Sequence, residues 1–263
     1  MSSAAPENLT VVKIGGSVLT GPAALGRTAA ALAARVAHDR AKFLVVVSAE
    51  LGHTDLLLDE ARALSPDPSE AALDLLWSTG ELRSVALLTL ALESQGVAVR
   101  GLNVHEAGLH VGDRGLTLNP LAVRAALARS AVVVVPGFLA TRELRVVTLG
   151  RGGSDLSAVS LAILLRADRC ELVKDVDGYF TADPNIDAHA TLVPALDFDE
   201  ALRLADEGCP LVQRQAIAAA RAAGLPLVVR SLTSEGSVIG LGPVSGLHDF
   251  PTSRLFDFPT FKE

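Results

Sequence analysis

Two glycine-rich turns carry basic side chains and have the composition of anion-binding sites. The first reads KIGGS (residues 13–17) and follows an apolar run; the second reads LGRGGSD (residues 149–155) and opens a helical pattern. Glycine lets backbone amides approach a ligand closely, and the start of a helix attracts negative charge. The two turns therefore indicate sites for phosphate or carboxylate groups.

The basic residues in these turns suit that chemistry. Lys13 offers a mobile positive charge for phosphate, and Arg151 offers a planar guanidinium for a carboxylate or a phosphate. Only four of the 23 basic residues are lysines, so a lysine at a glycine corner stands out. The structural alternative is a solvated lysine at a strand end and a helix cap at Ser154 or Asp155. Neither turn has the spacing of a Walker A loop or a dinucleotide-binding fingerprint.

A third loop, KDVDGYFTADP (residues 174–184), combines three carboxylates, aromatic rings and a turn glycine after an apolar run. Such a loop can hold a nucleotide. Tyr179 can stack or pack against a base, and the aspartates can orient ribose hydroxyls or a hydrated magnesium ion. The simpler alternative is an acidic surface turn.

Composition limits the classes of partner. The 263 residues are 49% hydrophobic, with a net charge of -7 and a pI near 5.4. This length can bury a large core in one α/β domain, and the acidic balance argues against nucleic acid and anionic membranes as partners. No apolar run is long enough to span a bilayer. Two cysteines, the absence of a secretory-signal pattern and histidines without metal spacing predict a cytoplasmic protein without a zinc site.

The elements that must position these turns alternate between strand and helix. Apolar runs predict strands buried on both faces at residues 9–14, 43–47, 97–102, 131–135, 170–173 and 226–229. Helical periodicity predicts helices at residues 23–38, 70–94, 121–128, 155–165, 197–206 and 212–223. A polar turn at 142–145 predicts a hairpin flap over residues 139–148, which leads into the second glycine turn.

This alternation predicts a three-layer α/β/α sandwich with a mainly parallel central sheet. Ligands of such sheets bind beyond the carboxyl ends of the strands, where both glycine turns lie. The tail from residue 242 has no periodicity and predicts a surface arm or an oligomer contact.

The sequence resembles the catalytic domain of aspartate kinases, within the amino acid kinase family. The most specific segments are TLGRGGSDLSA (148–158) and KDVDGYFTADP (174–184), with further matches at 13–17, 45–57, 79–90 and 133–140. The resemblance implies a lobe of about residues 1–150 that binds an amino acid and a lobe of about 151–241 that binds ATP. It also implies transfer of a phosphoryl group to a side-chain carboxylate, with an acyl phosphate as the product. Because that carboxylate is already ionised at neutral pH, the reaction needs alignment and charge neutralisation rather than a general base.

The resemblance assigns roles to individual residues. Lys13 would neutralise the transferring phosphoryl group, and Asp155 would orient Lys13 or the substrate ammonium. Backbone amides of Gly15, Gly16, Gly152 and Gly153 would bind phosphate oxygens. Substrate binding would fall to Ser17, Ser48, Thr54, Glu81, Arg151 and Ser154, with Glu81 on the α-ammonium and Arg151 on a carboxylate. Nucleotide binding would fall to Lys174, Asp175, Tyr179, Asp183 and Arg214, with Mg²⁺ bridging the phosphates of ATP and no metal ligand from the protein. Structural alternatives are helix stabilisation by Glu81 and helix capping by Thr54.

Several departures from the family pattern keep other functions open. The KIGGSVL corner is more similar to isopentenyl phosphate kinases, the usual Gly-Glu-Arg-Leu becomes Gly80-Glu81-Leu82-Arg83, and Pro210 replaces a nucleotide-contacting lysine, for which Arg214 is a substitute. The alternatives are a different acceptor, such as a phosphate or a specialised metabolite, and a non-catalytic regulatory protein. We expect a homodimer and, because the sequence ends soon after the last predicted strand, no regulatory ACT domains.

Overall fold

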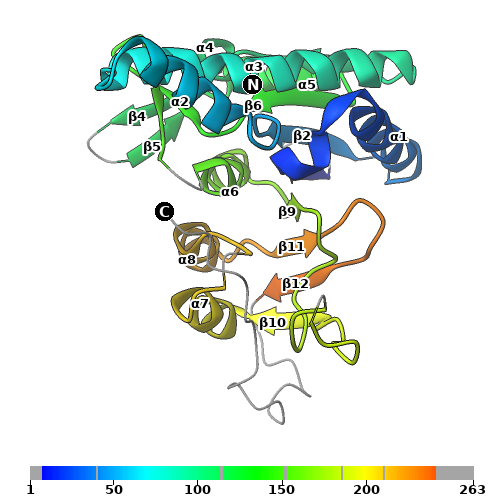
Figure 1. Cartoon of the computed structure of the whole chain (residues 1–263). Coiled ribbons are helices and arrows are strands. Elements are labelled where there is room, and N and C mark those ends of the chain that lie inside the picture. The colour runs from blue at the N-terminus through cyan, green and yellow to red at the C-terminus, as the bar shows by residue number, and fades with distance from the viewer. Residues whose placement is uncertain are drawn as a thin grey trace.

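An eight-stranded sheet with the order β10-β12-β11-β9-β1-β2-β6-β3 runs through the centre of the molecule (Figure 1). The computed structural model describes residues 8–39, 41–112, 115–150, 153–184, 186–209 and 211–240. The strands are β1 (Leu9–Ile14), β2 (Lys42–Val47), β3 (Val99–Gly101), β6 (Val132–Pro136), β9 (Arg169–Val173), β10 (Ala195–Asp197), β11 (Leu227–Arg230) and β12 (Ser237–Gly240). All neighbours are parallel except β11 and β12.

Helices cover both faces of this sheet. On one face lie α1 (Gly21–Asp39) and α3 (Glu70–Ser94), with α2 (His53–Leu64) packed on α3. On the other lie α5 (Leu121–Arg129), α6 (Gly153–Leu165), α7 (Phe198–Asp206) and α8 (Arg214–Ala223). In Figure 1, α3 runs along one side of the molecule, and α7 with β10 lies at the opposite end. The predicted α/β/α sandwich is therefore confirmed.

The predicted strands and helices are all present, with bounds that shift by a few residues. The strand expected over 97–102 is only Val99–Gly101, and its residues are half-buried or exposed because β3 is the edge strand. The interior strands β1, β2 and β6 are buried almost throughout, as their unbroken apolar runs predict.

A second sheet, with the order β5-β4-β7-β8, covers one end of the fold. Its strands are β4 (Leu109–Gly112), β5 (Gly115–Leu118), β7 (Leu139–Arg142) and β8 (Arg145–Thr148). The hairpin of β7 and β8 confirms the predicted flap. Short helical segments at α4 (Val104–Ala107) and η1 (Gly16–Leu19) complete the described elements.

In the described part of the chain, α3 alone has the length and apolar composition of a membrane span. Its buried residues include Val85, Leu88 and Leu92, which belong to the core between α3 and the sheet. The same helix contacts α1, α2 and β6, so part of its apolar surface is buried within the fold.

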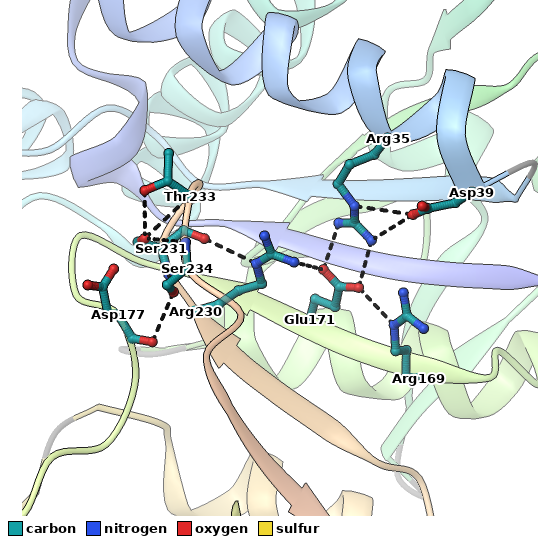
Figure 2. A network of polar contacts seen from close by, with 9 residues as sticks. All are labelled: Arg35, Asp39, Arg169, Glu171, Asp177, Arg230, Ser231, Thr233 and Ser234. Carbon is teal, nitrogen blue, oxygen red and sulfur yellow. Dashed lines mark hydrogen bonds and ion pairs between the residues drawn. The ribbon is translucent and has the colours of Figure 1, made fainter. Parts of the chain in front are cut away.

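A buried ion-pair network ties α1 to the centre of the sheet (Figure 2). Glu171 on β9 is 1% exposed, and its carboxylate accepts two hydrogen bonds from Arg35 of α1, at 2.7 and 2.8 Å. Arg169 donates a further bond at 2.8 Å, and Arg230 lies 3.8 Å away. Arg35 also stacks over the Phe43 ring of β2, 4.9 Å from its centroid.

Replacing Glu171 with glutamine should lower the free energy of unfolding at pH 7 by about 3 kcal/mol, because three guanidinium groups lose a buried counter-ion. Burial alone would raise the pKa of Glu171, but Arg35 and Arg169 outweigh it and hold that pKa below its ordinary value of 4.5. The advantage of wild type over E171Q should therefore be complete above about pH 4.5 and shrink as the pH falls further. Urea unfolding followed by circular dichroism at pH 7 and pH 4 measures both effects.

The matched control is E200Q, which removes the more exposed ion pair of Glu200 with Arg203 on α7. This change should cost less than about 1 kcal/mol. A loss in E171Q no larger than that in E200Q would contradict the role of the network.

Candidate active site

Two lysines end neighbouring parallel strands and point to the same face of the sheet. Lys13 lies near the end of β1, and Lys174 directly follows β9, whose Leu172 is in register with Lys13. Side chains alternate along a strand, and Lys13 shares the parity of Val11, as Lys174 shares that of Leu172. Both of these residues belong to the core on the α6 side of the sheet. The strand register therefore directs both lysines toward α6.

Asp155, in the first turn of α6, binds both lysines. Its Oδ1 lies 3.1 Å from Lys13 Nζ, and its Oδ2 lies 3.0 Å from Lys174 Nζ. The side chains of the three residues are 7–17% exposed. Each carboxylate oxygen thus has its own ammonium partner, and the two positive groups lie on either side of one negative group.

Burial and the two lysines act in opposite directions on Asp155. Burial would raise the pKa of this carboxyl, but the charges and hydrogen bonds of Lys13 and Lys174 lower it to about 2. Burial also lowers the pKa of the Lys174 ammonium, which Asp155 partly opposes. Asp155 is therefore a fixed negative charge at neutral pH, and it holds two cations beside the first glycine turn.

The first glycine turn is packed closely against neighbouring backbone. A Cβ on Gly15 would lie 3.3 Å from the Val173 carbonyl oxygen and 3.7 Å from Lys13 Nζ. A Cβ on Gly16 would collide with the carbonyl oxygen of Ala49, because the turn passes close to the end of β2. Gly16 is therefore required for the close approach of two chain segments.

Two of the predicted phosphate-binding amides already have partners. The Gly15 amide donates to the Val173 carbonyl at 2.9 Å, and the Gly153 amide donates to the Gly150 carbonyl at 3.0 Å. In this structure these two amides link neighbouring strand ends and close the turn before α6, and their binding of phosphate stays a prediction. Gly152 and Arg151 lie outside the described residues.

Glu81 is a buried acid in the middle of α3. Its side chain accepts a hydrogen bond from the backbone amide of Ala49, and Oε2 has no hydrogen-bond partner among the described residues. Burial raises the pKa of Glu81 to about 8, against the opposing effects of Ala49 and the charge of Lys13. An unpaired buried carboxylate oxygen is costly unless a cationic group satisfies it. The arrangement suits an ammonium ligand better than helix stabilisation at a surface.

The predicted hydroxyl ligands surround the ends of β1 and β2. Ser48 directly follows β2, and its amide donates to the Ile14 carbonyl at 3.2 Å. Ser17 is half-buried in η1, and Ser154 lies at the start of α6, against Gly137. Thr54 lies in the first turn of α2, where Gly52 is the N-cap residue, so Thr54 is not the cap.

Three predicted nucleotide ligands are buried or paired in this structure. Tyr179 is 1% exposed and packs in the core, so its ring offers no surface for stacking in this structure. Phe180, the next residue, is half-buried. Arg214 pairs with Asp206 on the protein surface. Asp183 is buried, at 6% exposure.

Lys174 and Asp175 line a cavity of about 510 Å³ together with Ser17. Asp175 is exposed, and the cavity extends between α1 and the segment after β11. Residues predicted to contact acceptor and nucleotide thus share one hollow. Pro210, at the position of the usual lysine, lies outside the described residues. No group of three or more metal-ligating side chains occurs among the residues that the structure describes.

Together these groups form a site with two cations held by Asp155, a buried acid whose Oε2 has no hydrogen-bond partner in the described part of the chain, and a glycine turn. Such a site can bind the phosphates of a nucleotide next to a small molecule that carries an ammonium group. Asp155 has both oxygens engaged by lysines, so it is an organiser of positive charge rather than a free base.

The chain is similar to known enzymes over most of its length. The model of the amino acid kinase family matches residues 8–231. An aspartokinase of Thermus thermophilus is 39% identical over 209 residues, which cover 76% of this chain and 52% of the relative. An aspartokinase of Corynebacterium glutamicum is 39% identical over 233 residues, which cover 85% and 54%. The chain thus spans about half the length of these relatives.

Solved structures agree with the sequence comparisons. The aspartate kinase of Synechocystis superposes with a TM-score of 0.80 at 37% identity, covering 90% of this chain and 40% of that one. A uridylate kinase of Archaeoglobus fulgidus, at 19% identity, has a TM-score of 0.63 over 88% of this chain and 99% of its own, and this likeness extends to the fold alone. The paired lysines lie at the ends of neighbouring strands, and the family model matches residues 8–231. This chain therefore belongs to the amino acid kinase family.

Proposed function

We propose that this chain phosphorylates the side-chain carboxylate of aspartate, or of a close amino-acid analogue, with ATP as the donor. The observation that carries the proposal is the pair of lysines held on the two oxygens of Asp155 beside the glycine corner. The similarity to aspartokinases over about three quarters or more of the chain supports the choice of acceptor.

The chemistry requires little beyond charge and alignment. A carboxylate oxygen of the acceptor attacks the γ-phosphorus of ATP, and the bond from that phosphorus to the β,γ-bridging oxygen breaks. ADP departs with the electron pair, and the product is an acyl phosphate. No proton moves, because the acceptor is already ionised at neutral pH. Lys13 and Lys174 neutralise charge on the transferred group and on the departing oxygen.

Asp155 keeps the two ammonium groups in place before ATP binds. Lysine side chains are flexible, so without a shared partner each would lose more conformational freedom when it binds phosphate. The cavity lined by Ser17, Lys174 and Asp175 would accommodate the phosphates. Mg²⁺ would enter bound to the phosphates and would supply further charge neutralisation, and the exposed Asp175 lines the same cavity as Lys174.

The acceptor would bind through its α-ammonium to the unpaired Oε2 of Glu81. Hydroxyls of Ser17, Ser48, Thr54 and Ser154 would complete the pocket, with Arg151 on a carboxylate. Asp175, Asp183 and the loop around them would hold the nucleotide. We infer that the acceptor lies on the lobe of about residues 1–150 and the nucleotide on that of about 151–241, in a homodimeric, cytoplasmic enzyme.

Incubation of the purified protein with ATP, Mg²⁺, aspartate and hydroxylamine should yield aspartyl hydroxamate, because hydroxylamine traps an acyl phosphate. The ferric hydroxamate absorbance measures the product, and ADP release measures turnover. The control omits aspartate. Turnover without hydroxamate, or no turnover with any acidic amino acid, would contradict the proposed carboxylate acceptor.

The variant K174M should lower kcat by about 10²-fold, because removal of one group that stabilises developing charge typically costs that much. The matched control is K42M: Lys42 Nζ donates to the Ser130 carbonyl at the start of β2, away from the site. Steady-state ADP release measures both variants. Equal rates for K174M and K42M would remove Lys174 from the reaction.

The KM for aspartate should fall on the order of tenfold as the pH rises from 6.5 to 8.5, because Glu81, with a pKa of about 8, must ionise to pair with the substrate ammonium. In E81Q the KM should be high, and its pH dependence should be lost. A pH series of initial rates with saturating ATP tests this, and an unchanged profile in E81Q would show that Glu81 does not bind the acceptor.

A further inference from the structure

Helix α3 carries a second polar side chain on the same face as Glu81. Asp74 precedes Glu81 by seven residues, which is two turns of an α-helix. Its Oδ1 accepts two hydrogen bonds from Thr148, one from the backbone amide at 3.0 Å and one from the hydroxyl at 2.6 Å. Thr148 is the last residue of β8, so Asp74 joins α3 to the end of the hairpin.

The residues after Thr148 continue this connection to α6. The Leu149 amide donates to the Phe138 carbonyl at 2.9 Å. Gly150 has a left-handed backbone, with a φ of 77°, and its carbonyl accepts the Gly153 amide at 3.0 Å. Gly153 begins α6, two residues before Asp155. Thr148 thus lies two residues before Gly150, whose carbonyl bonds to the first residue of the helix that holds the lysines.

Trp77, three residues after Asp74, braces the same segment. Its ring packs edge-on against Phe138, with centroids 6.3 Å apart and planes at 62°. Phe138 has a φ of 62°, a conformation that is costly for a side chain of this size. The Phe138 ring lies 3.2 Å from the place where a Cβ on Gly153 would be. Phe138 therefore lies between Trp77 of α3 and the first residue of α6, and its carbonyl also accepts the amide of Leu149, the residue after Thr148.

We propose that Asp74 is a positioning residue of the phosphoryl-transfer reaction. By tying β8 to α3, it fixes the position of the acceptor group on α3, Glu81, relative to Asp155 and the two lysines. This inference rests on the proposed function. Efficient transfer needs the attacking oxygen and the phosphoryl group aligned closely, and a displacement of about 1 Å can cost on the order of 10²-fold in rate.

The contact between Asp74 and Thr148 can be removed without disturbing the core, because the Asp74 side chain contributes little packing. Asp74 and Thr148 are half-buried and line a cavity of about 930 Å³ between α3 and the β7–β8 hairpin. Truncation of Asp74 therefore leaves no closed void in the core. D74A should fold, and the loss of the tie can be measured by itself.

In D74A, kcat should fall at least tenfold, while the Kd for ADP measured by calorimetry stays within twofold of wild type. T148V removes the hydroxyl bond but keeps the amide bond, so it should lower kcat less than D74A does. The double variant D74A/T148V should match D74A, because Asp74 accepts both bonds. D74N, which keeps an acceptor oxygen, should recover most of the rate. The control is E93A, an exposed acid near the end of α3, which should match wild type.

Hydrogen exchange of the protein without ligands separates this inference from the proposed function. Amides of residues 153–158 should exchange faster in D74A than in wild type or E93A, whether or not the protein turns over aspartate. An unchanged kcat in D74A, additive losses in the double variant, or unchanged exchange at 153–158 would overturn the role of Asp74. Faster exchange in D74A, with no turnover by wild type, would support the tie and reject the acceptor.

Discussion

The Asp155 carboxylate, shared by Lys13 and Lys174, is the interaction on which the site depends. An ionised carboxylate with this degree of burial is costly unless it is paired, and here each oxygen meets an ammonium group. The same contacts hold two flexible lysines close together before any ligand arrives. Their combined charge exceeds that of Asp155, so the site favours an anion, and its partial exclusion of water strengthens that preference.

The architecture places these three residues together from distant parts of the chain. Lys13 and Lys174 become neighbours only because β1 and β9 pair in parallel, and α6 must then begin above their ends. Other polar contacts join the same elements. Glu171 ties α1 to β9, and Asp74 ties α3 to β8, so each connects a part of the fold that carries or supports a site residue. These polar contacts of Glu171 and Asp74 lie at junctions between a helix and a strand, where they hold the two elements together.

Long apolar patterns made much of the fold predictable from sequence. Strand β1 and helix α3 have the predicted bounds, because each is uniformly apolar or clearly ended by polar residues. Strands β4 and β12 were not predicted. Each has only four residues, and a mixture of buried and exposed positions over so short a length gives no clear hydrophobic pattern. Among the site residues, the family pattern pointed to Lys13 and Asp155. The bond from Lys174 to Asp155 and the use of the Gly15 amide by Val173 depend on strand register, which no local pattern reveals. The burial of Tyr179 in the core likewise follows from packing in the folded chain, which the loop sequence does not reveal.

A crystal structure of the protein with MgADP, aluminium fluoride and aspartate tests the central claim most directly. In that complex, Lys13 Nζ and Lys174 Nζ should lie within about 3 Å of the fluoroaluminate or of the adjoining β-phosphate oxygen, with both still bound to Asp155. Glu81 would contact the ammonium group of the bound aspartate, away from the carboxylate that attacks the phosphorus. A transition-state mimic bound away from the two lysines, or lysines that leave Asp155 and face solvent, would contradict it.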